Sequence, residues 1–282
     1  MLSPVEFVSD LANPALGFLP RALVISIIVA AVCGVVGTHV VLRGMAFIGD
    51  AVAHAVFPGI AIAFALEVSI LAGGAVAGAT VALLIAVFSQ RRRVKEDTLI
   101  GIFFAASFAL GLVIISRVQG YTGSLTSILF GSITGVSEAD ILVAFVVGVG
   151  VVTLLIALTP QLTALALDRE TARAMNLPVL LLDVILYLAV TAAVVISLRT
   201  IGNILVLALL ITPAATARLL TNRLPSMMAL AALIGVGGSV LGLYLSWALD
   251  APAGATIVLT LTAVFLLTWV ANPVRFRSKV PA

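Results

Sequence analysis

Nine predominantly apolar runs, each about 17–22 residues long, alternate along the sequence with short polar or Gly/Pro-rich breaks. A run of this length is enough for an α-helix to cross the hydrocarbon core of a bilayer. The runs lie at 21–42, 45–66, 68–89, 98–117, 139–159, 180–198, 203–220, 226–248 and 254–271. The fifth and seventh have the least distinct boundaries, because the Gly/Ser/Thr-rich stretch at 120–137 and the pair Gly202-Asn203 blur their edges. The pattern predicts an all-α, polytopic integral membrane protein with eight or nine transmembrane helices.

Composition supports the same class. Of the 282 residues, 62% are hydrophobic and 10% are charged, whereas a soluble domain is about half apolar and a quarter charged. Residues 1–20 are mixed in character and are expected to form an N-terminal surface or interfacial segment. Residues 21–272 are expected to form one transmembrane domain, followed by a tail at 273–282. The single cysteine, Cys33, excludes an internal disulfide and is interpreted as a small packing residue.

The basic residues predict the orientation of the chain. Loops rich in Lys and Arg stay on the cytoplasmic side of the membrane. If the basic loop at 91–95 is cytoplasmic, alternation of the spans places twelve of the fifteen basic residues on that side and leaves only Arg21, Arg117 and Arg199 outside. The C-terminus is therefore predicted to be cytoplasmic.

Two polar side chains stand inside the second apolar run. Asp50 and His54 are four residues apart, so they lie on one face of a helix, one turn from each other. A carboxylate in hydrocarbon costs about 3 kcal/mol on insertion scales, so it is expected to face a protected interior and to have a partner. A carboxylate oxygen and an imidazole nitrogen make half of a divalent transition-metal site. The alternative is a satisfied polar pair that only fixes helix packing.

The sequence around this pair, Met-Ala-Phe-Ile-Gly-Asp-Ala-Val-Ala-His-Ala-Val-Phe-Pro-Gly at 45–59, resembles the signature of the metal-ion ABC transporter permeases. These are the membrane subunits of bacterial zinc and manganese importers. The resemblance covers about residues 20–272, and it implies that Asp50 and His54 are metal ligands in the permeation path. It also implies a plasma-membrane protein that acts as a homodimer, in which a second copy supplies further ligands. Ala53 departs from the family, which usually has serine there.

His39 is the only other histidine, and it lies in the first apolar run. It is a weaker candidate for a metal ligand, nearer the predicted cytoplasmic side. The alternative is a histidine satisfied by a backbone carbonyl. The family more often has an apolar or aromatic residue at this position.

A polar stretch at 168–178 predicts a short cytoplasmic helix of two to three turns. Asp168 is a suitable N-cap, and Asn176 followed by Pro178 is a suitable end. The stretch resembles the family's coupling helix, which docks on the ATP-binding subunit. The resemblance implies that the contact residues, besides Asp168, are Glu170, Arg173, Ala174 and Met175. An amphipathic segment lying on the bilayer is the alternative.

Two further residues interrupt apolar runs. Pro213 breaks the hydrogen-bond ladder of a helix inside the membrane, and the resulting kink is interpreted either as a moving gate element or as a fixed bend. Asp183 lies a few residues inside the sixth run and is interpreted as a charge near the membrane interface.

Neither lysine, Lys95 nor Lys279, belongs to a phosphate-binding loop, so ATP would have to be hydrolysed by a separate subunit. The chain itself is therefore not predicted to be an enzyme, and no permanently bound cofactor or nucleic-acid surface is expected. The resemblance implies transport of Mn(II), Zn(II) or Fe(II). It implies as partners an ATP-binding cassette subunit, an extracytoplasmic metal-binding protein, a second copy of the chain and membrane lipid. Two alternatives remain at this point: a carrier driven by an ion gradient without an ATPase, and an intramembrane hydrolase.

Overall fold

The computed structural model describes residues 4–90, 94–116, 135–201 and 203–272, which are helical apart from short turns and caps. The elements are α1 (Pro4–Leu11), the 3-10 turn η1 (Pro14–Leu16), α2 (Phe18–Leu42), α3 (Ile48–Ala65), α4 (Ile70–Ser89), α5 (Glu96–Ile115), α7 (Glu138–Leu167), α8 (Arg169–Ala174), α9 (Val179–Ile201), α10 (Asn203–Leu220), α11 (Leu224–Leu249) and α12 (Ala253–Ala271). Residues 91–93 of the basic loop, which is predicted to be cytoplasmic, and the predicted tail 273–282 lie outside the described residues.

Seven helices in the described ranges, α2, α4, α5, α7, α9, α11 and α12, are long and apolar enough to cross a membrane, and α3 and α10 are shorter apolar helices. These nine helices correspond one to one with the nine apolar runs. The prediction of an all-α, polytopic membrane protein is therefore confirmed.

The end of α7 is the boundary that differs most from expectation. The fifth run was predicted to end near residue 159, but the helix continues through Pro160 to Leu167. Thr159, beside the proline, donates its hydroxyl to the carbonyl of Leu155 at 2.7 Å, so this polar side chain is satisfied within the helix. A proline removes one backbone donor and can be accommodated in a membrane helix. Pro160 is therefore an internal residue of α7 and not its end.

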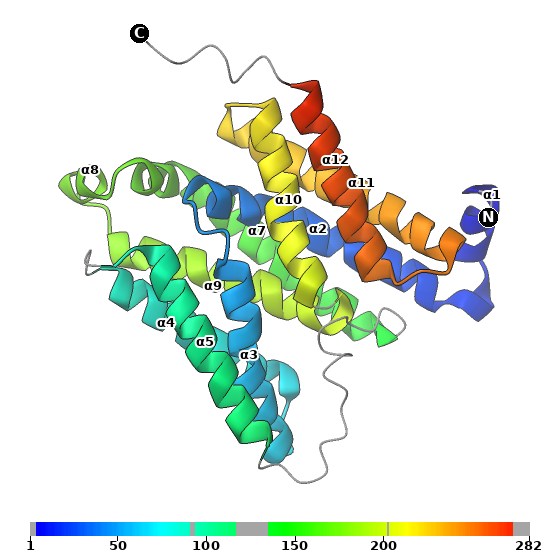
Figure 1. Cartoon of the computed structure of the whole chain (residues 1–282), viewed down its shortest axis with the longest axis horizontal. Coiled ribbons are helices and arrows are strands. Elements are labelled where there is room, and N and C mark those ends of the chain that lie inside the picture. Colours follow the sequence, from blue (N-terminus) through cyan, green and yellow to red (C-terminus); the bar gives the residue numbers. More distant parts are fainter. Residues whose placement is uncertain (1–3, 91–93, 117–134, 202, 273–282) are drawn as a thin grey trace.

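Two helices, α2 and α9, hold the bundle together. α9 packs against α2, α3, α4, α7 and α10, and α2 packs in addition against α10, α11 and α7. Figure 1 shows α3, α4 and α5 running together as one group of neighbouring helices, with α10, α11 and α12 as another. α3, the element that carries Asp50 and His54, therefore packs against the central α9 as well as against α4 and α5.

Glycines allow the closest helix contacts. A Cβ atom added at Gly37 of α2 would lie 1.7 Å from the carbonyl oxygen of Leu210 in α10. A Cβ atom at Gly59 of α3 would lie 2.1 Å from the carbonyl oxygen of Gly73 in α4, and one at Gly73 would lie 2.5 Å from the carbonyl oxygen of Gly59. Backbones that approach this closely have no room for a side chain, as is common between membrane helices.

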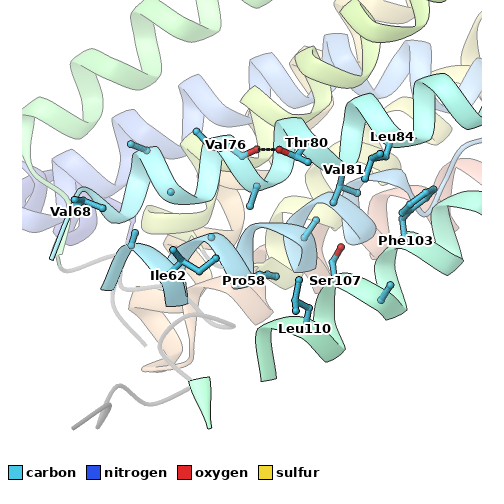
Figure 2. A pocket seen from close by; sticks show the side chains of 17 residues that line it. Pro58, Ile62, Val68, Val76, Thr80, Val81, Leu84, Phe103, Ser107 and Leu110 are labelled. Atoms are coloured by element: carbon cyan, nitrogen blue, oxygen red, sulfur yellow. Dashed lines mark hydrogen bonds between the residues drawn. The ribbon is translucent and has the colours of Figure 1, made fainter. Parts of the chain in front are cut away.

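An apolar cavity of about 730 Å³ lies among α3, α4 and α5 (Figure 2). Pro58, Val76 and Leu110 are among the side chains that line it, and hydroxyl groups come from Thr80 and Ser107. The hydroxyl of Thr80 donates to the carbonyl of Val76 at 2.8 Å. The residues that line it include no carboxylate and no imidazole, so neither Asp50 nor His54 belongs to this cavity.

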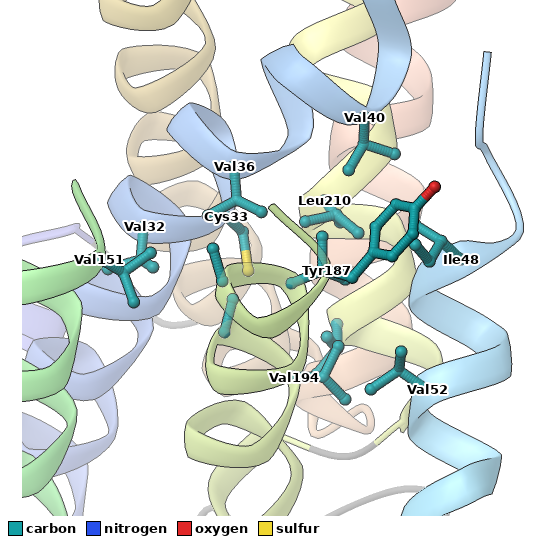
Figure 3. Packing of buried hydrophobic residues seen from close by; sticks show 14 of the residues in the cluster. Val32, Cys33, Val36, Val40, Ile48, Val52, Val151, Tyr187, Val194 and Leu210 are labelled. Carbon is teal, nitrogen blue, oxygen red and sulfur yellow. The ribbon is translucent and has the colours of Figure 1, made fainter. Parts of the chain in front are cut away.

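The core lies where α2, α3, α9 and α10 meet (Figure 3). Tyr187 of α9 is fully buried there, and Figure 3 shows it beside Ile48 of α3 and Leu210 of α10. Cys33 is also fully buried within this cluster, which agrees with its interpretation as a packing residue. The core therefore fixes the start of α3 against α9.

The N-terminal segment is attached to the end of α11. Phe7 of α1 is buried and meets the ring of Tyr244 edge-on, with the centroids 5.5 Å apart. The indole N–H of Trp247 donates to the carboxylate of Asp10 at 3.0 Å. Val5 and Val8, on the other side of α1, are exposed. The expected surface segment is thus a short helix with one face docked on the bundle.

Candidate metal centre

Asp50 and His54 both lie near the beginning of α3. The chain leaves α2 at Arg43, turns through Gly44 and enters α3 after Phe47. Gly44 has φ +69°, a left-handed conformation that glycine adopts without a steric cost. Asp50 therefore lies in the first turn of α3, where the positive end of the helix dipole favours a carboxylate.

The structure brings the two predicted ligands together. The Nδ1 atom of His54 lies 3.0 Å from the backbone carbonyl oxygen of Asp50 and 3.4 Å from its Oδ1 atom. In a neutral ring, a hydrogen bond from Nδ1–H to the carbonyl places the lone pair on Nε2, which is the atom that can ligate a metal. The side chains are 32% and 18% exposed for Asp50 and His54, so both are accessible from outside the single chain.

Two phenylalanines of α5 hold the imidazole ring. Phe104 and Phe108 are stacked on each other, and both meet the ring of His54 edge-on with centroid distances of 4.8 and 5.2 Å. Such contacts restrict the ring to one orientation. Sequence reasoning missed this pair, although its i, i+4 spacing in an apolar helix was a signal that both rings share one face.

The third candidate, His39, does not join the pair. It is buried in α2, with 3% of its surface exposed. Within the described ranges, no three or more His, Cys, Asp or Glu side chains form a group that could hold a metal ion. The suggestion that His39 is a weaker ligand stays a prediction. The described part of one chain therefore offers one carboxylate and one imidazole at this site, which is half of a usual coordination shell.

The short helix predicted at 168–176 is present as α8, although it has six residues and so fewer than the expected two to three turns. Asp168 is its N-cap, and the carboxylate accepts hydrogen bonds from the backbone N–H groups of Glu170 and Thr171 at 3.2 and 3.0 Å. Asn176 follows the helix with φ +57°, the left-handed conformation expected of this residue at a helix end. The cap and the stop of the helix are therefore confirmed.

The predicted contact residues of α8 lie on its outer surface. Glu170, Arg173, Ala174 and Met175 are all exposed, and Met175 is 59% exposed. Ala172, on the inner side, is fully buried. The role of the outer residues in docking another subunit stays a prediction.

Asp183, interpreted from the sequence as a charge near the membrane interface, has partners that the sequence does not identify. Its side chain is fully buried and forms ion pairs with Arg43 and Arg169. The sequence contained a signal for this, since a charge inside a membrane helix needs a partner, but the partners lie 140 and 14 residues away. Only the tertiary fold identifies them.

Arg43 remains a cation in this setting. Burial alone would lower the pKa of its guanidinium, but the neighbouring carboxylates of Asp183 and Glu96 raise the pKa above its ordinary value. The end of α2 therefore carries a fixed positive charge, which Asp183 neutralises.

Pro213 lies inside α10 and is buried. The helix is continuous from Asn203 to Leu220, and the hydroxyl of Thr216 donates to the carbonyl of Thr212 at 2.7 Å. A role of this proline as a gate or as a fixed bend stays a prediction.

The sequence profile of the ABC 3 transport family matches residues 15–272. The chain is 42% identical to the manganese transport system membrane protein MntC of Halalkalibacterium halodurans over 91% of its own length and 88% of that protein. It is 35% identical to the chelated iron transport system membrane protein YfeC of Yersinia pestis, over 88% and 84% of the two chains. Among solved structures, PsaBC from Streptococcus pneumoniae in complex with Fab superimposes with a TM-score of 0.85 at 36% identity, over 98% of this chain and 99% of that one. The chain belongs to the ABC 3 transport family and is a metal-ion ABC transporter permease, a multi-pass membrane protein.

Proposed function

We propose that this chain is the membrane-spanning subunit of an ATP-driven importer of divalent transition metal ions, Mn(II), Zn(II) or Fe(II), in the bacterial plasma membrane. The observation that carries the proposal is the pairing of Asp50 with His54 on one turn of α3, with the imidazole oriented by its bond to the backbone and by two phenylalanines. An oxygen and a nitrogen donor suit these metals. The relatives' names, which mention manganese and iron, support the same group of metals.

A second copy of the chain would complete the coordination. Two protein ligands are too few to hold an ion during transport, and a two-fold axis would supply an identical pair. The partial exposure of Asp50 and His54 in the single chain supports this arrangement, since a site closed within one chain would be buried. The ion is the cargo in this proposal, not a resident cofactor. An extracytoplasmic metal-binding protein would deliver the ion to the outer mouth.

Energy would enter from an ATP-binding cassette subunit docked on the exposed side of α8. We assign this side of the bundle, together with the C-terminus, to the cytoplasm on the distribution of basic residues. The exposure of Glu170, Arg173 and Met175 fits a docking surface. A gradient-driven carrier that works without an ATPase is the alternative function.

Reconstitution separates the two functions. Proteoliposomes containing the chain alone and proteoliposomes containing it with its ATP-binding subunit are supplied with Mn²⁺, Zn²⁺ or Fe²⁺, with the extracytoplasmic binding protein present in both. We expect uptake only when the ATP-binding subunit and ATP are present. Uptake by the chain alone, driven by a proton or sodium gradient, would overturn the proposal in favour of the carrier.

The cap of α8 gives a further prediction. Asp168→Ala removes the acceptor of two backbone N–H groups, which costs about 1 kcal/mol in the docking helix and is expected to weaken binding of the ATP-binding subunit by about fivefold. Asp168→Asn keeps a capping oxygen and should bind almost as well as the parent. Titration of the purified subunits measures both affinities. If both variants bound equally weakly, the carboxylate charge and not the cap would be responsible.

A further inference from the structure

The carboxylate of Asp183 is the meeting point of several distant elements. It is fully buried in α9 and forms ion pairs through Oδ1 with Arg43, at the end of α2, and through Oδ2 with Arg169, the first residue of α8. Gln90, which caps the end of α4, donates its amide to Oδ2 at 2.9 Å. A single side chain therefore connects four separate parts of the chain.

Arg169 extends the connection to α5. One of its terminal nitrogens, Nη2, binds Asp183, and the other, Nη1, binds Glu96 at the start of α5. Two guanidinium groups, of Arg43 and Arg169, thus face two carboxylates. The side chains of Arg43, Arg169 and Glu96 are 5%, 16% and 22% exposed, so the cluster is largely withdrawn from water but balanced in charge.

Such a cluster is weak evidence for stability. Removing charges from water costs free energy that the ion pairs only partly recover, and apolar residues of similar volume often stabilise a protein as well or better. The cluster contributes more to orientation than to stability, because a guanidinium held by two carboxylates through separate nitrogens has a fixed orientation. The cluster therefore fixes the relative positions of the elements it joins.

The elements joined are those that the proposed function requires to move together. Arg169 is the first residue of α8, the helix that we propose docks on the ATP-binding subunit. Within this chain, α8 packs mainly on α7 and α9. Arg43 begins the turn that leads through Gly44 into α3, which carries Asp50. The guanidinium of Arg43 also lies over the ring of Tyr187, 5.8 Å from its centroid, so its position is defined on two sides.

We propose that Asp183 is a positioning residue that transmits displacement of α8 to the start of α3, and so couples ATP-driven movement to the metal ligands. The inference rests on the proposed function and adds to it the route of coupling. It assigns no contact between Asp183 and the metal. Loss of the link is expected to leave ATP hydrolysis active while fewer ions are transported per ATP.

The first test replaces the guanidinium group of Arg169, with its two terminal nitrogens, by an ammonium group of the same charge. Arg169→Lys leaves the buried charges balanced, but a single ammonium cannot span both Glu96 and Asp183 as the guanidinium does. In proteoliposomes with the ATP-binding subunit and the binding protein, we expect ions transported per ATP to fall about 5- to 10-fold, with hydrolysis within about twofold of the parent. The matched control is Arg21→Lys in the exposed pair with Glu138, which should leave both quantities unchanged.

The second test addresses Asp183 directly. The double variant Asp183→Asn/Arg43→Gln removes one negative and one positive charge and retains the pair of Arg169 with Glu96. It therefore cuts the connection to α3 without leaving an uncompensated buried charge. The same fall in ions per ATP is expected. An unchanged ratio in this variant or in Arg169→Lys would overturn the proposal, as would a parallel loss of hydrolysis and transport, which indicates a purely structural cluster.

A spectroscopic measurement separates this inference from the metal assignment. Phe47, just before α3, is 61% exposed, and the only natural cysteine is buried, so Phe47→Cys can be spin-labelled selectively. We expect ATP to change the label's mobility in the complex with the parent permease but not with the Asp183→Asn/Arg43→Gln variant. This signal requires no metal, so it holds even if Asp50 and His54 prove not to bind the ion. An ATP response that persists in the double variant would overturn the coupling route alone.

Discussion

Replacing Asp50 or His54 by alanine is expected to abolish metal uptake while the protein still assembles in the membrane. Loss of an outer partner of a metal ligand already lowers affinity or activity by about 10- to 100-fold, so loss of a direct ligand should reduce uptake by about 100-fold or more. Assembly should persist because both side chains are partly exposed and neither substitution leaves a buried charge. Uptake of Mn²⁺ or Zn²⁺ in a bacterial strain that lacks its own importer measures the effect.

The matched control for these variants is Asp97→Ala. Asp97 is an exposed acid in the first turn of α5, so its removal changes the net charge as Asp50→Ala does without touching the pair. The amount of permease in the membrane, measured by immunoblot, must be equal in all variants. Normal uptake with Asp50→Ala and with His54→Ala would contradict the assignment of the metal centre.

The substitution Gly37→Ala is expected to have the largest effect on stability. The new methyl group would lie 1.7 Å from the carbonyl oxygen of Leu210, so α2 and α10 would have to separate in the middle of the bundle. Overpacking against backbone that cannot rotate away should cost about 3 kcal/mol. Thermal unfolding of the detergent-solubilised protein would show this as a clearly lower midpoint.

Gly150→Ala is the control, because it makes the same substitution within another helix. Gly150 lies within α7, and a Cβ atom there meets nothing within 4 Å. Because alanine favours a helix over glycine by up to about 1 kcal/mol, this variant should be neutral or slightly stabilised. Equal midpoints for the two variants would show that α2 and α10 are not packed as closely as described.

The helices were predictable because membrane insertion leaves the chain few choices. A run of about 20 apolar residues has to satisfy its backbone hydrogen bonds internally, which only a helix achieves within one segment. Hydrophobicity alone therefore placed the nine apolar helices of the described residues. It failed at the end of α7, where the predicted run ends near residue 159 but the helix continues through Pro160 to Leu167.

The candidate site was predictable only where its geometry is local. The spacing of Asp50 and His54 fixes their relation on one helix, and Asp168 and Asn176 are local signals for the two ends of α8. The aromatic support from Phe104 comes from another helix. The partners of Asp183 also come from other elements, Arg43 from the end of α2 and Arg169 from the start of α8, and only the fold identifies them.

The mutual contact of Gly59 and Gly73 has a mechanical consequence. Since each backbone occupies the space where the other residue's side chain would be, α3 and α4 interlock and travel as one hairpin, joined through Glu67 at φ +55°. Sliding of one helix along the other would bring a residue with a side chain into this close contact, so the two helices are expected to move together. Relative displacement within the bundle is therefore expected at the contacts of this hairpin with its neighbouring helices and not between α3 and α4.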